Sequence, residues 1–556
     1  MEAPRHLSIV SYAVNGSGLG HLSRMVAINR WIRRYSVLAG IRTQQWFLTT
    51  SEADTLLFHE GFAGFKLPSK SIVDEAGIPK PAYLGLAKQW VWHSVGLLRP
   101  DILLVDTFPN GSFQELLGVL DLCRHKALVL RPVKEEFAQR ASFRAMAQLY
   151  DRVIVPEDPP GMGSVDVADA LGLDDARVRH VGPVMLTERF ELLPRDEARR
   201  RLGVPTGATC LLVSAGGGGD PGVDAVVDAV LELVAERPDV HAVVAAGPLH
   251  RGPARHGPRV TFWTAPGLGP HLSGVDAAVS AAGFNTLHEL ALAGVPALFI
   301  PQEKVADDQQ ARVSSWVERG AALTAQARDA ASVRRGVEQL LDPVSLARLR
   351  EAAPEVFTNH ARDAAAEVLS LVLPPSLVRG VHGALTDEFL GELGTRGVSL
   401  AEAVDLWVAL HPDEDAVDRA APALSMTRTL MDSAARAGAP TPAVTRVAQA
   451  LGRRMRSQGT TTAAVADALC LLLHHRATTG QWTGLAALVR AFGTERELSP
   501  RAFADLLMSV ADQAAAAGVD LAGLARLATD TQTDGELGNA ALAARLRERL
   551  RSEARA

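Results

Sequence analysis

A turn between two apolar segments carries residue types that could hold a nucleotide. It lies in residues 279–301, V-S-A-A-G-F-N-T-L-H-E-L-A-L-A-G-V-P-A-L-F-I-P. Gly283 precedes a helix-favouring segment, and the N–H groups at a helix N-terminus lack partners within the helix and attract phosphate. Glu289 falls about one turn into that helix, where its carboxylate could accept hydrogen bonds from ribose hydroxyls. The pattern predicts a strand–turn–helix–strand unit with a phosphate site at its turn.

The segment at residues 14–24, V-N-G-S-G-L-G-H-L-S-R, places a histidine directly after a glycine-rich turn. Gly18 and Gly20 permit backbone torsions and close approaches that a side chain would prevent, so they are candidate contacts to a nucleotide sugar. His21 stands where a helix should begin, with no core to fill, so we interpret it as a candidate general base. A dinucleotide fingerprint is the alternative. It would need an acidic residue at the end of the second strand, which instead ends in Thr-Thr-Ser.

Asp106 ends another apolar run, within R-P-D-I-L-L-V-D-T-F at residues 99–108. In a doubly wound parallel sheet the carboxyl ends of neighbouring strands share one edge. His21 and Asp106 can therefore meet there, and the carboxylate would fix the tautomer of the histidine. The alternative is that Asp106 only caps the turn that follows it.

A second glycine loop, S-A-G-G-G-G-D, follows an apolar run in the second half of the chain. Its open backbone N–H groups suit a diphosphate. The candidate residues are Ser214, Gly216, Gly217, Gly218 and Gly219. A flexible turn is the alternative. Thr264 is a candidate contact to a nucleotide base, although a packing role explains it equally well.

These patterns resemble the nucleotide-sugar-binding half of GT-B glycosyltransferases, above all family 28, which includes the peptidoglycan enzymes that add N-acetylglucosamine to lipid I. That family has S-x-x-G-x-x-T-x-x-E, then G-x-P-x-x-x-x-P, then D-x-Q-Q, which is D-D-Q-Q at residues 307–310 here. The resemblance covers residues 6–373. It implies a donor site made of Gly283, Phe284, Asn285, Thr286, Glu289, Asp308, Gln309 and Gln310. Asp308 replaces a basic residue of the family, which leaves the identity of the sugar open.

The N-terminal loop resembles the acceptor-side loop of GT-B enzymes. It also resembles the G-x-G-H-x-x-R loop of the nucleotide-sugar hydrolase of pseudaminic acid synthesis, with Arg24 as the arginine. The motif that ends at Phe108 resembles P-D-x-x-x-x-D-x-F of UDP-glycosyltransferases, whose second aspartate orients the catalytic histidine. The resemblance implies that His21 is the base and Asp106 its orienting partner.

Composition describes a globular protein without a basic surface. The chain has 556 residues, 22% of them charged, and a net charge of −6, which argues against a nucleic-acid partner. Cys123, Cys210 and Cys470 lie in apolar runs and are odd in number, so we expect buried free thiols. The sequence shows no signal region at its start and no apolar run long enough to cross a membrane. It also shows no motif with the residue spacing of a metal site. We expect a cytoplasmic protein that touches at most the inner face of the membrane.

Apolar runs alternate with helical segments in residues 1–180 and again in residues 181–358. This alternation predicts an α/β fold of two doubly wound, Rossmann-like domains, which in the GT-B plan face a cleft. Residues 178–184 should cross between the domains, and a helix within residues 359–375 should return to the first.

Residues 376–556 are rich in Ala and Leu and have repeated helix starts, including a capping box at Ser399 and an N-cap followed by proline at Ser499. They predict an all-α accessory domain, which would serve a homo-oligomer or a protein partner. No fixed repeat is evident, so a solenoid lacks support.

Together these features predict an inverting, metal-independent glycosyltransferase. Its co-substrate would be a nucleotide-diphospho sugar, expected to be UDP-linked, and it would need no cofactor. The acceptor, whether a small molecule, a lipid or a glycan, stays open. Two alternatives also stay open: a nucleotide-sugar hydrolase in which His21 activates water, and a catalytically weak GT-B scaffold that recruits partners through its helical domain.

Overall fold

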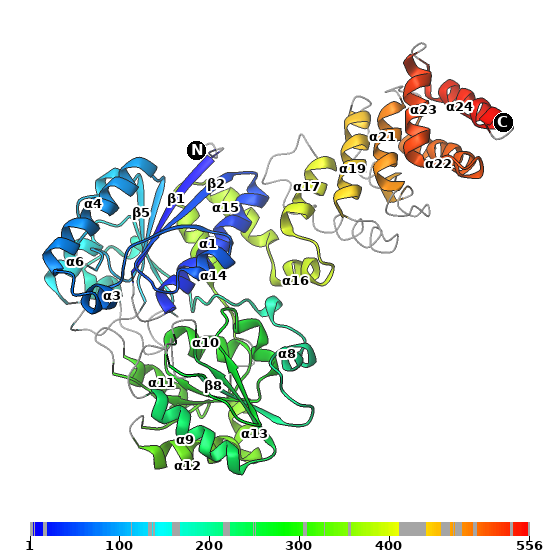
Figure 1. Cartoon of the computed structure of the whole chain (residues 1–556). Helices are drawn as coiled ribbons and strands as arrows, with labels where there is room; N and C mark the ends of the chain where they lie inside the picture. The colour runs from blue at the N-terminus through cyan, green and yellow to red at the C-terminus, as the bar shows by residue number, and fades with distance from the viewer. Residues whose placement is uncertain are drawn as a thin grey trace. The chain divides into compact units, whose positions relative to one another are not determined.

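The computed structural model describes residues 4, 6–14, 19–112, 114–131, 136, 139–157, 167–214, 223–247, 250, 252–303, 308–326, 329–353, 357–410, 441–456, 468–470, 472, 481–492, 498–533 and 537–553. The chain divides into two compact units. One comprises Met1–Ser36 with Ile41–Val378, and the other Arg379–Ala556 with Val37–Gly40. Figure 1 shows that the first unit consists of two layered α/β domains and the second of helices.

The first α/β domain is built on a seven-stranded sheet whose neighbouring strands all run parallel. In spatial order the strands are β3 (Ala63–Lys66), β2 (Arg42–Thr49), β1 (His6–Ala13), β4 (Ile102–Asp106), β5 (His125–Val129), β6 (Arg152–Val155) and β7 (Val178–His180). The helices are α1 (Gly20–Ala39), α2 (Thr55–His59), α3 (Lys70–Glu75), α4 (Lys80–Leu98), α6 (Ala141–Ala147) and α7 (Val167–Leu171). The α/β prediction is confirmed, with one correction: β7 occupies the start of the segment that was predicted to cross between the domains.

Strands β1 and β4 lie side by side in the centre of this sheet, with helices over both faces (Figure 1). Every residue of β4 is buried, and so are all residues of β1 after His6. Burial on both faces explains why these strands are mostly apolar. Tyr12 of β1 pairs with Val105 of β4, so the chain that leaves β1 passes the end of β4 at Asp106.

The second α/β domain repeats this plan with a six-stranded parallel sheet. Its strands, in spatial order, are β10 (Val260–Trp263), β9 (Val240–Ala245), β8 (Thr209–Ser214), β11 (Ala277–Ala281), β12 (Ala297–Ile300) and β13 (Leu323–Thr324). Its helices are α8 (Arg195–Arg201), α9 (Val223–Glu236), α10 (Phe284–Leu292), α11 (Gln309–Glu318), α12 (Ala330–Leu340) and α13 (Pro343–Ala352). Helices α9 and α12 share one hydrophobic core with the sheet, and α10 and α11 share another.

Asp276, directly before β11, has a structural role. The Asp276 carboxylate accepts a hydrogen bond from the Cys210 N–H at 2.8 Å and pairs with Arg199 at 2.9 Å. A second arginine, Arg195, lies 2.5 Å from the same carboxylate. These contacts fix the start of β11 beside β8.

Asn359 connects the two segments through which the chain passes between the α/β domains, because its side chain bonds to Met185 and Thr187. Its Oδ1 accepts a hydrogen bond from the Met185 N–H at 3.1 Å, and its Nδ2 donates to the carbonyls of Met185 at 2.9 Å and Thr187 at 3.1 Å. Helix α14 (Ala361–Leu369) then contacts β6 of the first sheet, and Arg152 pairs with Glu367 at 2.6 Å. Helix α14 therefore lies against the first domain.

Every element described in the second unit is a helix, which confirms the all-α prediction for the described residues. After α15 (Pro375–Ala384), the described helices are α16 (Asp387–Thr395), α17 (Leu400–Leu410), α19 (Thr441–Arg456), α21 (Gln481–Ala491), α22 (Pro500–Ala516), α23 (Leu521–Thr533) and α24 (Asn539–Glu553). The Glu402 carboxylate accepts a hydrogen bond from the Ser399 N–H at 2.8 Å, which completes the predicted capping box. Ser399 Oγ in turn accepts one from the Glu402 N–H at 3.2 Å.

These helices form a repeat that the sequence analysis did not recognise. Helices α17, α19, α21 and α23 begin 41, 40 and 40 residues apart, and each contacts the next in this series. Buried positions recur with them, as Val444, Leu485 and Leu524 do in α19, α21 and α23. An array in which equivalent helices stack on one another is the organisation of a helical solenoid. The sequence analysis missed this repeat because Ala and Leu recur in almost every helix of the unit, so that equivalent positions do not stand out.

We expect the first unit to fold without the helical array. Besides the clusters of its two α/β domains, this unit contains α14, whose residues Ala361, Ala364, Ala365, Val368 and Leu369 are buried, and a protein shortened after Ala384 keeps all of them. It should melt cooperatively, with a Tm within about 5 °C of the first transition of the full chain. A protein shortened instead after Leu340, which removes α14, is the matched control and should not fold. Aggregation of the Ala384 protein would show that the helices complete a core of the first unit.

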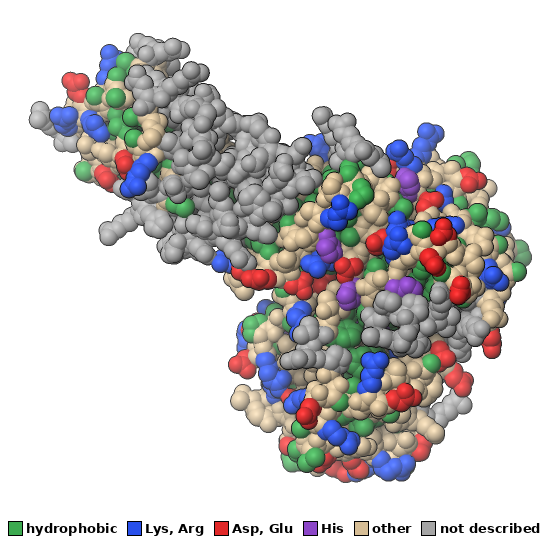
Figure 2. All heavy atoms as spheres, turned by 180° about the vertical axis from the view of Figure 1, so that it is seen from behind, with side chains coloured by type: hydrophobic (Ala, Val, Ile, Leu, Met, Phe, Trp, Pro, Cys, Tyr) green, Lys and Arg blue, Asp and Glu red, His purple; other side chains and the backbone are tan. Residues whose placement is uncertain are grey.

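The surface carries charges of both signs. Figure 2 shows lysine, arginine, aspartate and glutamate side chains interspersed over the visible face, with neither sign gathered into one large patch. Among the described residues no single helix is long and apolar enough to cross a membrane. One pair, Arg501–Ala516 with Leu521–Gln532, passes that test jointly but is bent by 113°.

The three cysteines are free. Cys123 and Cys210 are buried, and Cys470 is half-buried. Burial raises the pKa of the Cys123 thiol to about 12, and that of the Cys210 thiol likewise to about 12. Both are therefore uncharged thiols at neutral pH, and the expectation of free cysteines is confirmed.

Candidate functional site

A cavity of about 630 Å³ lies between the two α/β domains. Its volume is within the range of about 300–1,000 Å³ that small-molecule sites occupy. Two helices begin at its wall, because both Gly20 of α1 and Phe284 of α10 line it. Ser214 and Ala281, which end β8 and β11, line it as well. The cavity therefore occupies the carboxyl edge of the second sheet, where ligands bind in folds of this kind.

His21 and Asp106 meet at the first-domain side of this cavity. They are 85 positions apart in the chain, and the His21 Nδ1 contacts Asp106 Oδ2. The same carboxylate accepts a hydrogen bond from Thr107 Oγ1 at 2.9 Å and one from Arg24 Nε at 2.8 Å. His21 is 7% exposed and Asp106 is completely buried. The carboxylate is thus held by side chains, which favours the orienting role of Asp106 over a turn cap.

The charges around this pair favour an ionised aspartate and a neutral histidine. Burial by itself would raise the pKa of Asp106, but Arg24 and His21 outweigh it and lower the pKa to about 2. Burial also lowers the pKa of His21, and Arg131 and Arg24 add to that effect, whereas Asp106 opposes it. A neutral His21 that donates its Nδ1 proton to Asp106 keeps a free lone pair on Nε2.

The turn before α10 forms the second-domain side of the cavity. Gly283 is the N-cap of α10 and makes no side-chain cap, so the first N–H groups of the helix stay open toward a ligand. Gln309, at the start of α11, is buried and lines the cavity, and its Oε1 accepts a hydrogen bond from the Gln302 N–H at 2.9 Å. The turn offers hydrogen-bond donors and the positive end of a helix dipole to an anion.

Glu289 lines the cavity one turn into α10, as its place in the sequence suggests. Burial raises the pKa of its carboxyl group to about 7, although a backbone hydrogen bond from Leu186 works in the opposite direction. A carboxyl group that is costly to ionise in the empty cavity would be stabilised by hydrogen-bond donors from a ligand.

Asn285 connects the two sides of the cavity. Its Nδ2 donates to Ser23 Oγ at 2.6 Å, and it lies 3.4 Å from the carbonyl oxygen of Gly20. Phe284 beside it lies between two guanidinium groups, those of Arg24 and Arg312, each 5.5 Å from the ring centroid. The helix that carries His21 is therefore connected directly to the start of α10.

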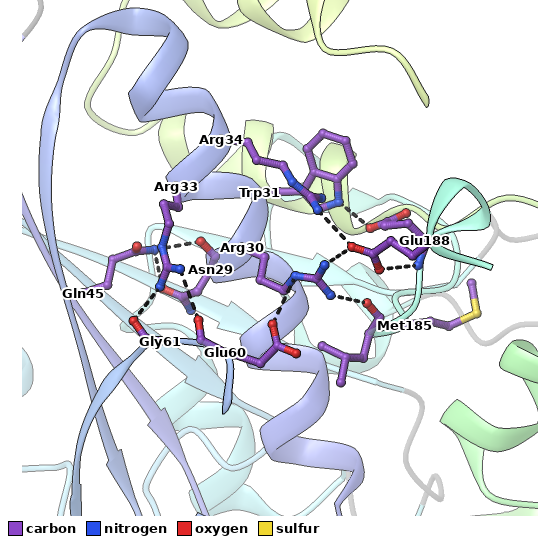
Figure 3. Close-up of polar contacts among 12 residues, drawn as sticks. Asn29, Arg30, Trp31, Arg33, Arg34, Gln45, Glu60, Gly61, Met185 and Glu188 are labelled. Carbon is purple, nitrogen blue, oxygen red and sulfur yellow. Dashed lines mark hydrogen bonds and ion pairs between the residues drawn. The ribbon is translucent and has the colours of Figure 1, made fainter. Parts of the chain in front are cut away.

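A network of charged side chains also fixes α1 to the segment that crosses between the domains (Figure 3). Arg30 Nη1 donates to the Leu186 carbonyl at 3.0 Å, and its other nitrogen pairs with Glu191. Trp31 Nε1 donates to Glu188 Oε1 at 2.5 Å. Because the Leu186 N–H hydrogen-bonds to Glu289, this segment links α1 to Glu289 of α10.

The structure brings most of the sequence-predicted residues together. Those that line the cavity are Gly20, His21, Ser214, Gly283, Phe284, Asn285, Thr286, Glu289 and Gln309, with Asp106 behind His21. Gly18, Gly216, Gly217, Gly218 and Gly219 lie outside the described residues. No group of three metal-binding side chains occurs among the residues that are described.

Three predicted residues do not reach the cavity wall. Thr264 follows β10 on the surface and is exposed. Asp308 is exposed and is the N-cap of α11, where its carboxylate accepts a hydrogen bond from the Ala311 N–H at 2.9 Å. Gln310 also points to the surface. Helix α11 turns only the first of its two glutamines inward, because consecutive helical residues lie about 100° apart.

Arg24 is the main residue that sequence reasoning undervalued. It appeared only as part of a motif, whereas the structure buries its side chain against Asp106. A signal was available, because residues three apart on a helix share a face and Arg24 therefore lies on the same side of α1 as His21.

The comparison with known proteins matches residues 266–368 to the glycosyltransferase family 28 C-terminal domain. A Cupriavidus necator protein named UDP-N-acetylglucosamine–N-acetylmuramyl-(pentapeptide) pyrophosphoryl-undecaprenol N-acetylglucosamine transferase is 26% identical over 372 residues, which cover 64% of this chain and 93% of that protein. A Gloeobacter violaceus protein of the same name is 37% identical over 112 residues, which cover 19% of this chain and only 31% of that protein.

Among solved structures, the crystal structure of Acinetobacter baumannii MurG covers 66% of this chain and 99% of its own, with 16% identity and a TM-score of 0.41. The architecture of the first unit, two Rossmann-like domains about a cavity, is the GT-B fold. With the family match in its second domain, the first unit resembles the glycosyltransferases of this fold. Within that class the chain resembles family 28.

Proposed function

We propose that this protein transfers a sugar from a nucleotide-diphospho sugar to a hydroxyl group, with inversion at the anomeric carbon and without a metal ion. The observation that carries the proposal is that His21, which contacts the buried Asp106, and the open N-terminus of α10 line one cavity. The first group suits removal of a proton and the second suits a leaving diphosphate.

The acceptor oxygen would attack the anomeric carbon from the side opposite the diphosphate. A bond forms between these two atoms while the bond from the anomeric carbon to the diphosphate oxygen breaks, and the electron pair leaves with the nucleotide. His21 Nε2 takes the acceptor proton, and Asp106 stabilises the imidazolium through Nδ1–H. The N–H groups at Gly283 and Phe284, together with the dipole of α10, stabilise the negative charge that grows on the diphosphate.

The donor is proposed to be UDP-linked, with Glu289 on the ribose and Gln309 near the sugar. Support comes from the printed activity of the Cupriavidus necator relative, a UDP-N-acetylglucosamine transferase. On the acceptor side, Leu19, Leu56 and Phe108 give the wall near His21 an apolar part. An acceptor with an apolar portion beside its hydroxyl, such as a lipid-linked glycan, fits this wall.

A binding screen followed by a turnover assay tests the proposal. UDP and one or more UDP-sugars should raise the Tm, by the equivalent of about 2.7 kcal/mol at one hundred times Kd, whereas ADP and GDP should have little effect. With the best donor, release of UDP should be slow in buffer and should accelerate when a lipid-linked or free glycan acceptor is added. Absence of any nucleotide binding would contradict the proposal.

The same assay separates the two alternatives from the transferase. Rapid release of UDP without an acceptor, at a rate that acceptors do not change, would identify a hydrolase in which His21 activates water. Tight nucleotide binding with no turnover under either condition would identify a scaffold without activity.

A further inference from the structure

Arg24 shares the carboxylate of Asp106 with His21. Its side chain is 1% exposed, and its Nε lies 2.8 Å from Asp106 Oδ1, while His21 contacts the other oxygen, Oδ2. All three side chains are at least nine-tenths buried. The carboxylate therefore lies between a permanent cation and a titratable ring, both of which α1 supplies three residues apart.

The charge balance of this group depends on Arg24. A buried carboxylate needs one positive partner, because an unpaired charge is costly away from water. Without Arg24, the Asp106 carboxylate would favour protonation of His21 more strongly, because His21 would be its nearest source of positive charge. Arg24 stays protonated at every physiological pH and already supplies the positive charge. A second proton, on His21, would then leave a net positive charge in the buried group.

We propose that Arg24 is a positioning residue that neutralises Asp106 and thereby keeps His21 uncharged and able to accept a proton. Asp106 can then hold the Nδ1–H of a neutral ring and leave Nε2 free toward the cavity. The charge balance follows from the buried contacts alone, whereas the catalytic consequence rests on the proposed function.

The other charged and titratable groups near this trio do not reverse the balance. Arg131 is a second cation whose charge acts on His21 in the same direction as that of Arg24. Across the cavity, burial lowers the pKa of His288 to about 3, so that this ring is neutral, and Arg312 and Arg24 add to the effect. Thr107 donates a hydroxyl hydrogen bond to Asp106 at 2.9 Å but carries no charge.

Histidine titration by NMR tests the charge balance without any need for activity. In the full-length protein labelled with 15N-histidine, with the His21 signals assigned by comparison with His21→Gln, we expect a neutral His21 with a proton on Nδ1 at pH 7. In Arg24→Gln the pKa of His21 should rise by about one unit or more, because Asp106 then depends on it for charge. Arg24→Lys, which keeps a cation, should show a smaller rise.

Arg33→Gln is the matched control, because Arg33 lies on the same helix but donates to the carbonyls of Glu60 and Gly61 at 3.1 and 3.0 Å instead of to Asp106. It should leave the titration of His21 unchanged. If the Arg24 variants do not fold, the wild-type titration still decides, since an imidazolium at pH 7 beside Arg24 would overturn the proposal. An unchanged pKa of His21 in a folded Arg24→Gln protein would also overturn it.

The pH profile of turnover tests the catalytic consequence. In Arg24→Gln, kcat/KM at pH 6.5 should fall about tenfold or more and should recover toward the wild-type value at pH 9, where His21 loses its extra proton. A role in packing alone would lower activity equally at both values, which would contradict the proposed role. If no turnover is found with any protein, the proposed function fails, and the titration alone still decides the charge balance.

Discussion

His21→Ala should lower turnover by about 100-fold or more, the usual scale for loss of a general base, while the affinity for UDP changes little. The ring contacts Asp106 and Phe108 on the first-domain side of the cavity, whereas the residues proposed to hold UDP belong to the second domain. Turnover measured at saturating donor and acceptor, with Kd for UDP from calorimetry, checks both parts. His93→Ala, which changes an exposed histidine of α4, is the control and should stay active.

Asp106→Asn should cost less than His21→Ala, and the two losses should not multiply. An amide cannot neutralise Arg24 or stabilise an imidazolium, but it can still occupy the site of the carboxylate. Once His21 is absent, Asp106 has no side chain to orient. The double variant should therefore resemble His21→Ala alone. A double variant that loses the product of the two single effects, or an active His21→Ala protein, would refute the pair as a catalytic unit.

Glu289→Ala should weaken UDP binding by about 1.5–3 kcal/mol, the range for hydrogen bonds to a charged group. Only the ionised carboxylate can accept from both ribose hydroxyls, and burial raises the pKa of Glu289 to about 7. The affinity of wild-type protein for UDP should therefore fall, by up to about tenfold, between pH 8 and pH 6. Glu289→Gln should lose this part of the pH dependence. Calorimetry at both pH values measures these effects.

Ionisation of Glu289, which should favour UDP binding, should lower the stability of the folded protein without ligand. The pKa of Glu289 rises from 4.5 to about 7 on folding. Ionisation of Glu289 therefore costs more free energy in the folded protein than in the unfolded chain. This cost is absent below about pH 4.5, grows with rising pH and is complete above about pH 7. Without ligand, Glu289→Gln should therefore be more stable than wild type at pH 8, by about 1–3 kcal/mol, but not at pH 4.

Glu318→Gln is the control for both measurements, because Glu318 is exposed at the end of α11. It should alter neither UDP affinity nor its pH dependence. Unchanged affinity in a folded Glu289→Ala protein would remove Glu289 from the nucleotide site and would leave the helix turn as the main donor contact.

The sequence by itself determined the local units of this protein. The apolar run that ends at Asp106 is strand β4, and the turn at Gly283 opens α10 as expected. Such units are readable because hydrophobic runs, glycines and caps act over a few residues. Parallel strands with their carboxyl ends at one edge then placed His21 near Asp106, since sheet topology restricts which segments can meet.

Only the tertiary structure decided which side chains share the cavity and which charges are shared. It buried Arg24 on Asp106, joined Asn285 to Ser23, and left Asp308 and Gln310 on the outer side of α11. It also revealed the 40-residue spacing between α19 and α21, and between α21 and α23. These outcomes depend on contacts between residues far apart in the chain and on burial. Burial changes the free energy of a charged group strongly, and short sequence patterns do not show which groups are buried.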